Sequence, residues 1–234
     1  GAPDIKVLTG DYFHWAATDI IYSKINYTTT TSVTDHSKPV AVSEISFTFL
    51  SDYSDGFVIS NAPFYEDGSY NKYYDGDNLI VLEQDDDAAV KILGDGWRIP
   101  TKEEIDELRK STYWIYDIND RGYYIFEEIL DRFKKSEKVP QKGMPFVLSV
   151  SDTPLNNDEK ERSLLYFPLP GKIESYPNQT TAPGTNGYYL INTRVANNSM
   201  NNECFVMSAA SHMEQLAISQ IERYRPCLIR PVHD

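Results

Sequence analysis

The sequence has little cysteine, no long apolar run and few basic residues for its length of 234. Its 2 cysteines are too few for a disulfide framework. No apolar run approaches the roughly 20 residues of a membrane-spanning helix, so we predict no membrane span. The 22 Lys and Arg residues face 35 Asp and Glu, which gives a net charge of −13. This charge argues against a nucleic-acid partner, because binding to phosphates relies on Lys and Arg.

The sequence also lacks the common catalytic motifs. Its 4 His residues are scattered and none lies in an H-E-x-x-H pattern. There is no G-x-S-x-G elbow, Walker loop or G-x-G-x-x-G turn. A glycosidase needs only two carboxylates, so the many acids leave a glycan-processing enzyme open as an alternative. We expect a protein that is not an enzyme and that carries no cofactor.

Aromatic residues make up 13% of the chain, with 17 Tyr, and this apolar content predicts a folded protein. Neither an internal repeat nor a Pro-rich or Ser-rich linker divides the chain, so we predict one domain over residues 1–234. Hydroxyl-rich and Asn-rich loops suit a secreted or surface protein. The predicted strands cover residues 45–50, 146–150, 164–169, 188–191, 204–207, 215–221 and 227–232.

Helices are predicted in the middle of the chain. Asp85 can cap a helix over residues 86–93, and Gly94 can end it. Residues 123–135 carry apolar side chains at helical spacing, although a strand starting at 123–125 remains open. Helices between two sets of strands predict an α+β fold with a mostly antiparallel sheet. We expect the two ends of the chain to lie in neighbouring strands.

A further helix is predicted after Pro100, because Pro disfavours helix before it. Thr101 and Glu104 have the spacing of a capping box, in which each side chain bonds the backbone of the other. Ile105 and Leu108 lie three residues apart and are expected to pack on the core.

Two features have open alternatives. Cys204 and Cys227 lie in apolar strand patterns and are either buried thiols or a disulfide between nearby strands. The acidic loop at 65–77 is either solvated or a weak Ca²⁺ site, since it does not fit the EF-hand spacing. Its possible Ca²⁺ ligands are Asp67, Asn71, Asp75 and Asp77. The run Asp85-Asp86-Asp87 fits a helix N-terminus better than a metal site.

Residues 94–108 form the most informative segment. They predict a turn, a buried Trp97, an extended Ile99 before proline, and a capped helix. Arg98 is expected to pair with a nearby carboxylate, and the acids of that helix are candidates. The residues that define this pattern are Trp97, Arg98, Pro100, Thr101 and Glu104.

This segment resembles the G-W-R-[LIM]-P-T-x-x-E-x-x-x-L pattern of the Fibrobacter succinogenes major paralogous domain family, found in surface proteins of Bacteroidetes. Weaker blocks follow the family's order and read GDYFHWAAT, LEQDDDAA, LLYFPLPG, GYYL and LIRPV, at residues 10–18, 82–89, 164–171, 187–190 and 228–232. The sequence departs from the family at Ala16, where Gly is usual, and at Leu190, where Trp is common. Residues 23–62 resemble an insertion.

The resemblance implies a C-type-lectin-like fold with two main helices, mostly antiparallel sheets and long irregular loops. It also implies a lipid anchor on the full-length precursor and residence on the outer-membrane surface of a Gram-negative bacterium. The calcium and sugar motifs of animal C-type lectins are missing, so calcium-dependent sugar binding is not implied. The segment is also similar to formylglycine-generating enzymes, but their R-G-G-S-W segment is absent.

These observations predict a non-enzymatic cell-surface recognition or adhesion module that binds a glycan or a protein through its loops. The candidate ligand-binding residues are Tyr176, Asn178, Tyr188, Asn192 and Arg194. One alternative is a structural or tip subunit of a surface fibre or outer-membrane complex, in which a sheet edge accepts a partner strand. A glycan-processing or formylglycine-generating-type enzyme is the third hypothesis.

Overall fold

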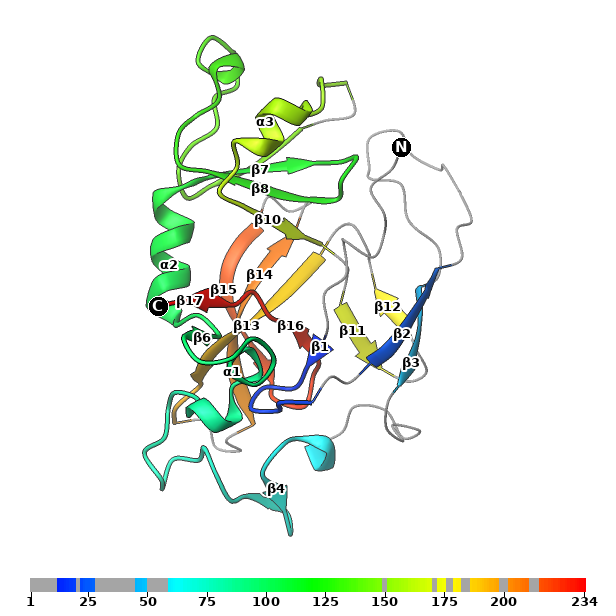
Figure 1. The fold of residues 1–234 in the computed structure, drawn as a ribbon, viewed down its shortest axis with the longest axis vertical. Coiled ribbons are helices and arrows are strands. Elements are labelled where there is room, and N and C mark those ends of the chain that lie inside the picture. The colour runs from blue at the N-terminus through cyan, green and yellow to red at the C-terminus, as the bar shows by residue number, and fades with distance from the viewer. Residues whose placement is uncertain are drawn as a thin grey trace.

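The structure is a computed structural model, and sheets dominate it. It describes residues 12–19, 22–27, 45–49, 59–148, 151–169, 172–175, 179–181, 186–197, 202–210 and 215–234. Figure 1 shows one sheet with α3 at the top of the view, a larger sheet below it, and α2 beside them. The predicted α+β class is confirmed, whereas the lectin-like assignment stays a prediction. No helix in the described ranges is both long and apolar enough to cross a bilayer.

A five-stranded sheet has the order β1-β16-β13-β14-β15. Its strands are β1 (Tyr12–Phe13), β16 (Cys227–Leu228), β13 (Asn186–Arg194), β14 (Glu203–Ala210) and β15 (Gln215–Glu222). All neighbours are antiparallel except β13 and β16. The expected pairing of the two ends of the chain is confirmed, since Tyr12 lies opposite Leu228. The strand predicted over 227–232 is in fact two short strands, because the chain leaves the sheet after Leu228.

A four-stranded sheet has the order β10-β8-β7-β9. Its strands are β10 (Leu165–Pro168), β8 (Gly122–Phe126), β7 (Tyr113–Asp117) and β9 (Pro145–Val147). The helix predicted over 123–135 is wrong, and the alternative strand is correct. A 3-10 turn, η4 (Asp131–Phe133), follows β8. Four of the five residues of β8 are buried, so the strand lacks the alternation of apolar and polar residues that would have identified it.

Short two-stranded sheets complete the fold. They are β2 (Tyr22–Tyr27) with β3 (Ile45–Phe49), β4 (Tyr65–Glu66) with β5 (Ser69–Tyr70), β6 (Trp97–Arg98) with β17 (Val232–His233), and β11 (Lys172–Ser175) with β12 (Gln179–Thr181). The described part of the predicted insertion contains the β2–β3 hairpin and a 3-10 turn, η2 (Ile59–Asn61). The strand expected at 45–50 is therefore confirmed over β3.

The helices are α1 (Ala88–Leu93), α2 (Lys102–Ser111) and α3 (Asn157–Glu161). Helix α1 begins two residues later than predicted. Its N-cap is Asp87 rather than Asp85, because a 3-10 turn, η3 (Gln84–Asp86), comes first and the Asp87 carboxylate accepts the Ala89 N–H. Gly94 ends the helix at φ 92°, as expected. Helix α2 has the predicted capping box.

The five-stranded sheet is buried on both faces. Alternate residues of β14 separate into two clusters, with Met207 in one and Val206 in the other. The first cluster joins the sheet to β7, β8 and β10 and contains Ile105 of α2, with Leu108 packed against it. The second cluster contains Trp15 and α1. The two sides of the sheet thereby hold the helices and the second sheet in fixed positions.

Candidate functional site

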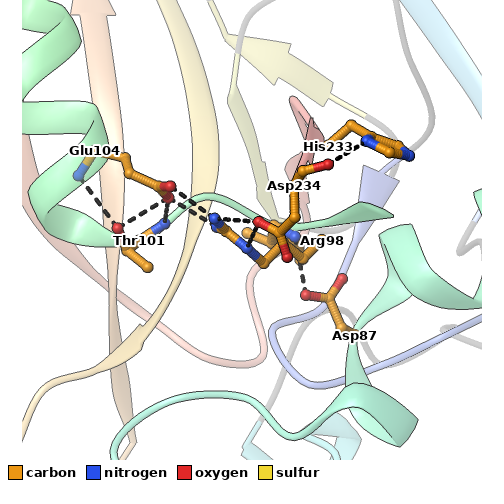
Figure 2. A network of polar contacts seen from close by, with 7 residues as sticks. Asp87, Arg98, Thr101, Glu104, His233 and Asp234 are labelled. Carbon is orange, nitrogen blue, oxygen red and sulfur yellow. Dashed lines mark hydrogen bonds and ion pairs between the residues drawn. The ribbon is translucent and has the colours of Figure 1, made fainter. Parts of the chain in front are cut away.

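The motif that carries the family resemblance forms a polar network between α2, β6 and β17 (Figure 2). The Arg98 guanidinium donates to both carboxylate oxygens of Glu104 at 2.7 Å. Its Nε and Nη2 also lie 2.9 and 2.8 Å from Asp234 Oδ1. The expected pairing of Arg98 with a helix acid is confirmed. This pairing holds the pKa of Glu104 at about 2.

Asp87 extends this network to α1. Its side chain is buried, and its two carboxylate oxygens accept the N–H groups of Ala89 at 2.8 Å and Ile99 at 2.9 Å. Burial raises the pKa of this carboxyl group. Trp97 is half-buried rather than buried, because its ring packs edge-on against His233, which is itself exposed. The motif therefore has a structural role, because its bonds connect α1, α2, β6 and the end of β17.

The three predicted ligand-binding residues that the structure describes do not form one exposed site. Tyr176 and Asn178 lie outside the described residues. Tyr188 is half-buried against the second cluster. Asn192 is buried, and its backbone bonds Pro100 and Leu82.

Arg194 is 2% exposed and faces the interior. Its guanidinium donates to Leu79 O at 2.7 Å, to Tyr74 O at 2.9 Å and to Asp75 Oδ1 at 2.7 Å. These three bonds tie the loop before α1 to the end of β13. Arg194 thus fixes the shape of a surface loop instead of presenting its charge to a ligand.

Three of the four weak Ca²⁺ candidates have separate protein contacts. Asp75 pairs with Arg194, whereas Asp77 accepts the N–H groups of Tyr73 and Leu79. Asn71 donates to Glu66 at 2.9 Å, and Asp67 is exposed. Among the described residues, no group of three His, Cys, Asp or Glu side chains is placed to hold a metal ion.

A buried arginine also holds the acidic loop at 65–77, a feature that the sequence did not indicate. Arg223 is 0% exposed, and its Cζ lies 4.1 Å from the ring centroid of Tyr70 and 4.8 Å from that of Trp15. Its Nη1 donates to Tyr73 O at 3.0 Å. Burial lowers the pKa of Arg223 to about 10, so it stays charged at neutral pH. The aromatic rings offset part of the cost of burying that charge.

Neither cysteine forms a disulfide, and both are buried. They lie on β14 and β16, which flank β13 on opposite sides. Cα atoms two strands apart in a sheet are roughly 10 Å from each other. A disulfide allows at most roughly 7 Å between the two Cα atoms. Burial raises the pKa of the Cys204 thiol well above its usual range, which disfavours the reactive thiolate. The buried-thiol interpretation is correct.

An open groove of about 670 Å³ lies between η4, β9 and α3. Its apolar floor is formed by Phe133, Phe146 and Leu148, and the two phenyl rings meet edge to face at 5.2 Å. The polar lining residues are Arg132, Ser136, Glu137, Lys138, Asp152, Thr153, Asn156 and Glu159. A groove of this size, with an apolar floor and a polar rim, fits a small-molecule or oligomeric ligand.

Arg132 sets the shape of this groove. Its guanidinium stacks 4.9 Å from the ring of Phe133, donates to Pro154 O at 3.0 Å and to Thr153 O, and pairs with Glu159 at 3.2 Å. Glu159 in turn accepts the Asn156 N–H at 2.9 Å in a capping box. The groove is therefore held open by bonds within the protein.

Sequence reasoning missed this groove, because it predicted a helix where η4 and its loop lie. The Asn156-x-x-Glu159 spacing was the one available signal for α3. No family model, curated protein or solved structure matches the chain. The fold and the site define its class, an α+β domain with two main sheets and an open groove.

Proposed function

We propose that this chain is a non-enzymatic recognition module of the cell surface that binds a neutral glycan in the groove between η4, β9 and α3. The observation that carries the proposal is the combination of a phenyl floor with charged side chains on the rim of a groove of about 670 Å³. Sugars have apolar C–H faces that pack on aromatic rings, and hydroxyl groups that bond carboxylates, amides and guanidinium groups.

The charges of the groove favour a neutral ligand. Arg132 and Lys138 supply positive charge, whereas Glu137, Asp152 and Glu159 supply negative charge. Neither sign dominates, so the groove has no strong field for a highly charged polymer. Groups of both signs can each bond a sugar hydroxyl, because a hydroxyl group both donates and accepts.

A binding role fits this groove better than catalysis. A glycosidase needs one carboxyl group that can donate a proton and a second that can attack or activate water. Glu159 instead bonds Arg132 and the backbone of Asn156, which makes it part of the scaffold. A surface location is supported by the family resemblance and by the polar loops, and a lipid anchor on the precursor belongs to the same proposal.

A glycan array probed with the labelled chain tests the ligand class. We expect a restricted set of neutral glycans to bind, and binding to persist when calcium is chelated. Glu137→Trp places a large side chain in the groove and should abolish the signal. Glu127→Trp is the matched control, because Glu127 is also exposed and lies outside the groove.

Three results would contradict the proposal. An array without signal would exclude a glycan from the set tested. Equal loss of binding in both Trp variants would place the ligand elsewhere. Release of reducing sugar from a bound glycan by the wild-type chain would show an enzyme instead of a binding module.

A further inference from the structure

The chain between η4 and β9 is exposed over six consecutive residues, 134–139, and none of them lies in a helix or strand. In the part of the chain that the structure describes, no other exposed run outside helices and strands is as long. Figure 1 shows the chain between β8 and β9 projecting at the top of the molecule. We call residues 134–139 the exposed segment.

The exposed segment is held only by local hydrogen bonds. The Lys134 N–H donates to Asp131 O at 3.2 Å. The Ser136 N–H donates to Phe133 O at 3.2 Å, and the Lys138 N–H donates to Ser136 Oγ at 3.2 Å. These bonds end within the segment or in η4. The segment can therefore open without breaking a bond of either sheet, and proteases cut folded chains at such places.

The residues on both sides of the exposed segment are fixed. Phe133 and Pro140 are buried. Beyond them, β9 pairs with β7 and β10 pairs with β8, so each pairing joins a strand before the segment to a strand after it. A cut within the segment therefore leaves the four-stranded sheet paired, and the two fragments stay together in one folded molecule.

The exposed segment contains the side chains that a trypsin-like endopeptidase recognises. Such an enzyme binds the residue before the cut in a pocket that carries a carboxylate, so it cuts after Lys or Arg. The bond after Lys135 lies nearest the middle, with two residues of the segment before it and four after it. The bond after Lys134 has one residue before it, and the bond after Lys138 has one after it. The bond after Lys135 is therefore the most accessible of the three.

This bond immediately precedes one wall of the groove. Ser136, Glu137 and Lys138 line the groove, and they are the first three residues after the bond. In the intact chain they are held from both ends, by the buried Phe133 and the buried Pro140. After a cut only the Pro140 end holds them, so this wall loses its fixed position.

We propose that the bond between Lys135 and Ser136 is a cleavage site for a trypsin-like endopeptidase, and that the cut releases this wall and ends ligand binding. Hydrolysis consumes one water. Its oxygen joins the carbonyl carbon of Lys135, the C–N bond breaks, and its two protons go to the nitrogen of Ser136. The loss of binding rests on the proposed function, whereas the cut and the release of the wall do not.

Limited digestion of the folded, full chain with trypsin tests the cleavage site. Mass spectrometry maps the earliest cut within residues 59–148, which we expect to follow Lys135. Size exclusion without denaturant should show the two fragments still together. Lys135→Gln should slow cutting within this range, whereas Lys134→Gln, the neighbouring control, should not. A first cut elsewhere in the range, or equal rates in the two variants, overturns the proposal.

An aminopeptidase added to the cut chain tests the release of the wall. This enzyme removes residues one at a time from a free amino end, and it needs an end that is not held against the protein. We expect the second fragment to lose Ser136, Glu137 and Lys138, with trimming that stops near the buried Pro140. A fragment that keeps Ser136 at its end would show that the wall stays in place.

A glycan found on the array separates this proposal from the proposed function. A glycan in the groove covers the residues after the bond, so at about ten times its dissociation constant it should slow the cut roughly tenfold. The cut chain should no longer bind it. Lys135→Gln should bind it like wild type, because Lys135 does not line the groove.

Two results decide between the proposals. A cut chain that still binds the glycan overturns the effect of cleavage on binding. A bound glycan that leaves the rate of cutting unchanged places the ligand outside the groove. That result contradicts the proposed function, and with it the loss of binding, while the cleavage site stands.

Discussion

Replacing Glu104 with Gln keeps the size of the side chain and removes its charge. The wild-type carboxylate accepts two bonds from Arg98 at 2.7 Å and bonds from the Thr101 N–H and Oγ1 at 2.8 and 2.9 Å. A Gln side chain has one carbonyl oxygen, which can take the place of Oε2 and keep its bonds to Thr101 and to Arg98 Nη1, but its NH₂ group cannot accept the second bond of the guanidinium pair.

The expected loss follows from the pKa of Glu104, which Arg98 lowers from 4.5 to about 2. A lowering of that size corresponds to about 3 kcal/mol of interaction with the charged form. The Glu104 side chain is 41% exposed, so solvent screening reduces the contribution. We therefore expect Glu104→Gln to lower the free energy of unfolding by about 1 to 2 kcal/mol at neutral pH.

The pH dependence provides a second check. The folded pKa lies below the unfolded value of 4.5, so the stabilisation is fully present above about pH 4.5 and is lost as the pH falls toward 2. Urea unfolding, followed by tryptophan fluorescence at a series of pH values, measures this. The difference between wild type and Glu104→Gln should be constant near neutral pH and should shrink below about pH 4.5.

Glu103→Gln is the matched control, since Glu103 is the exposed neighbour in the same first turn of α2. We expect it to cost no more than about 0.5 kcal/mol, the loss of a favourable charge near the helix N-terminus. Equal losses in the two variants, or a Glu104 effect that does not change between pH 7 and pH 3, would refute the role of the Arg98 pair.

Three further predictions follow from buried polar groups. Asp87→Asn leaves one of two buried N–H groups without its acceptor and should lower the free energy of unfolding by about 1 to 3 kcal/mol in urea; an unchanged midpoint would contradict this. Arg194→Met should speed amide exchange in residues 74–79 and leave exchange in β7 and β8 unaltered, because only the loop loses its bonds; uniform exchange would show a global effect. Cys204 and Cys227 should react with a thiol reagent only after unfolding in urea, since both are buried; rapid labelling of the native chain would refute it.

Local signals in the sequence predicted those parts of the fold that local chemistry decides. Thr101 and Glu104 gave the start of α2, because a capping box needs only residues three apart. Most predicted strands are confirmed for a similar reason, since short apolar runs suit a sheet buried on both faces. The same burial made β8 hard to recognise, because its apolar residues also fit a helix and its partners lie 5 or more residues away.

The candidate site was much harder to predict. Arg194 was proposed as a ligand-binding residue, but long-range packing places its guanidinium inside the molecule, where it bonds residues more than 100 positions earlier. The groove is likewise formed by η4, β9 and α3, which come together only when the four-stranded sheet is assembled. The spacing of residues within one segment cannot predict which distant segments will come together in the fold.

The pairing of β1 with β16 determines when the domain can fold during synthesis. Tyr12 has its partner at Leu228, so the larger sheet stays incomplete until more than 200 further residues have left the ribosome. Contacts this distant in sequence make folding slow. The larger sheet of the nascent chain is therefore completed only when β16 has been made, and β1 has no partner strand in that sheet until then.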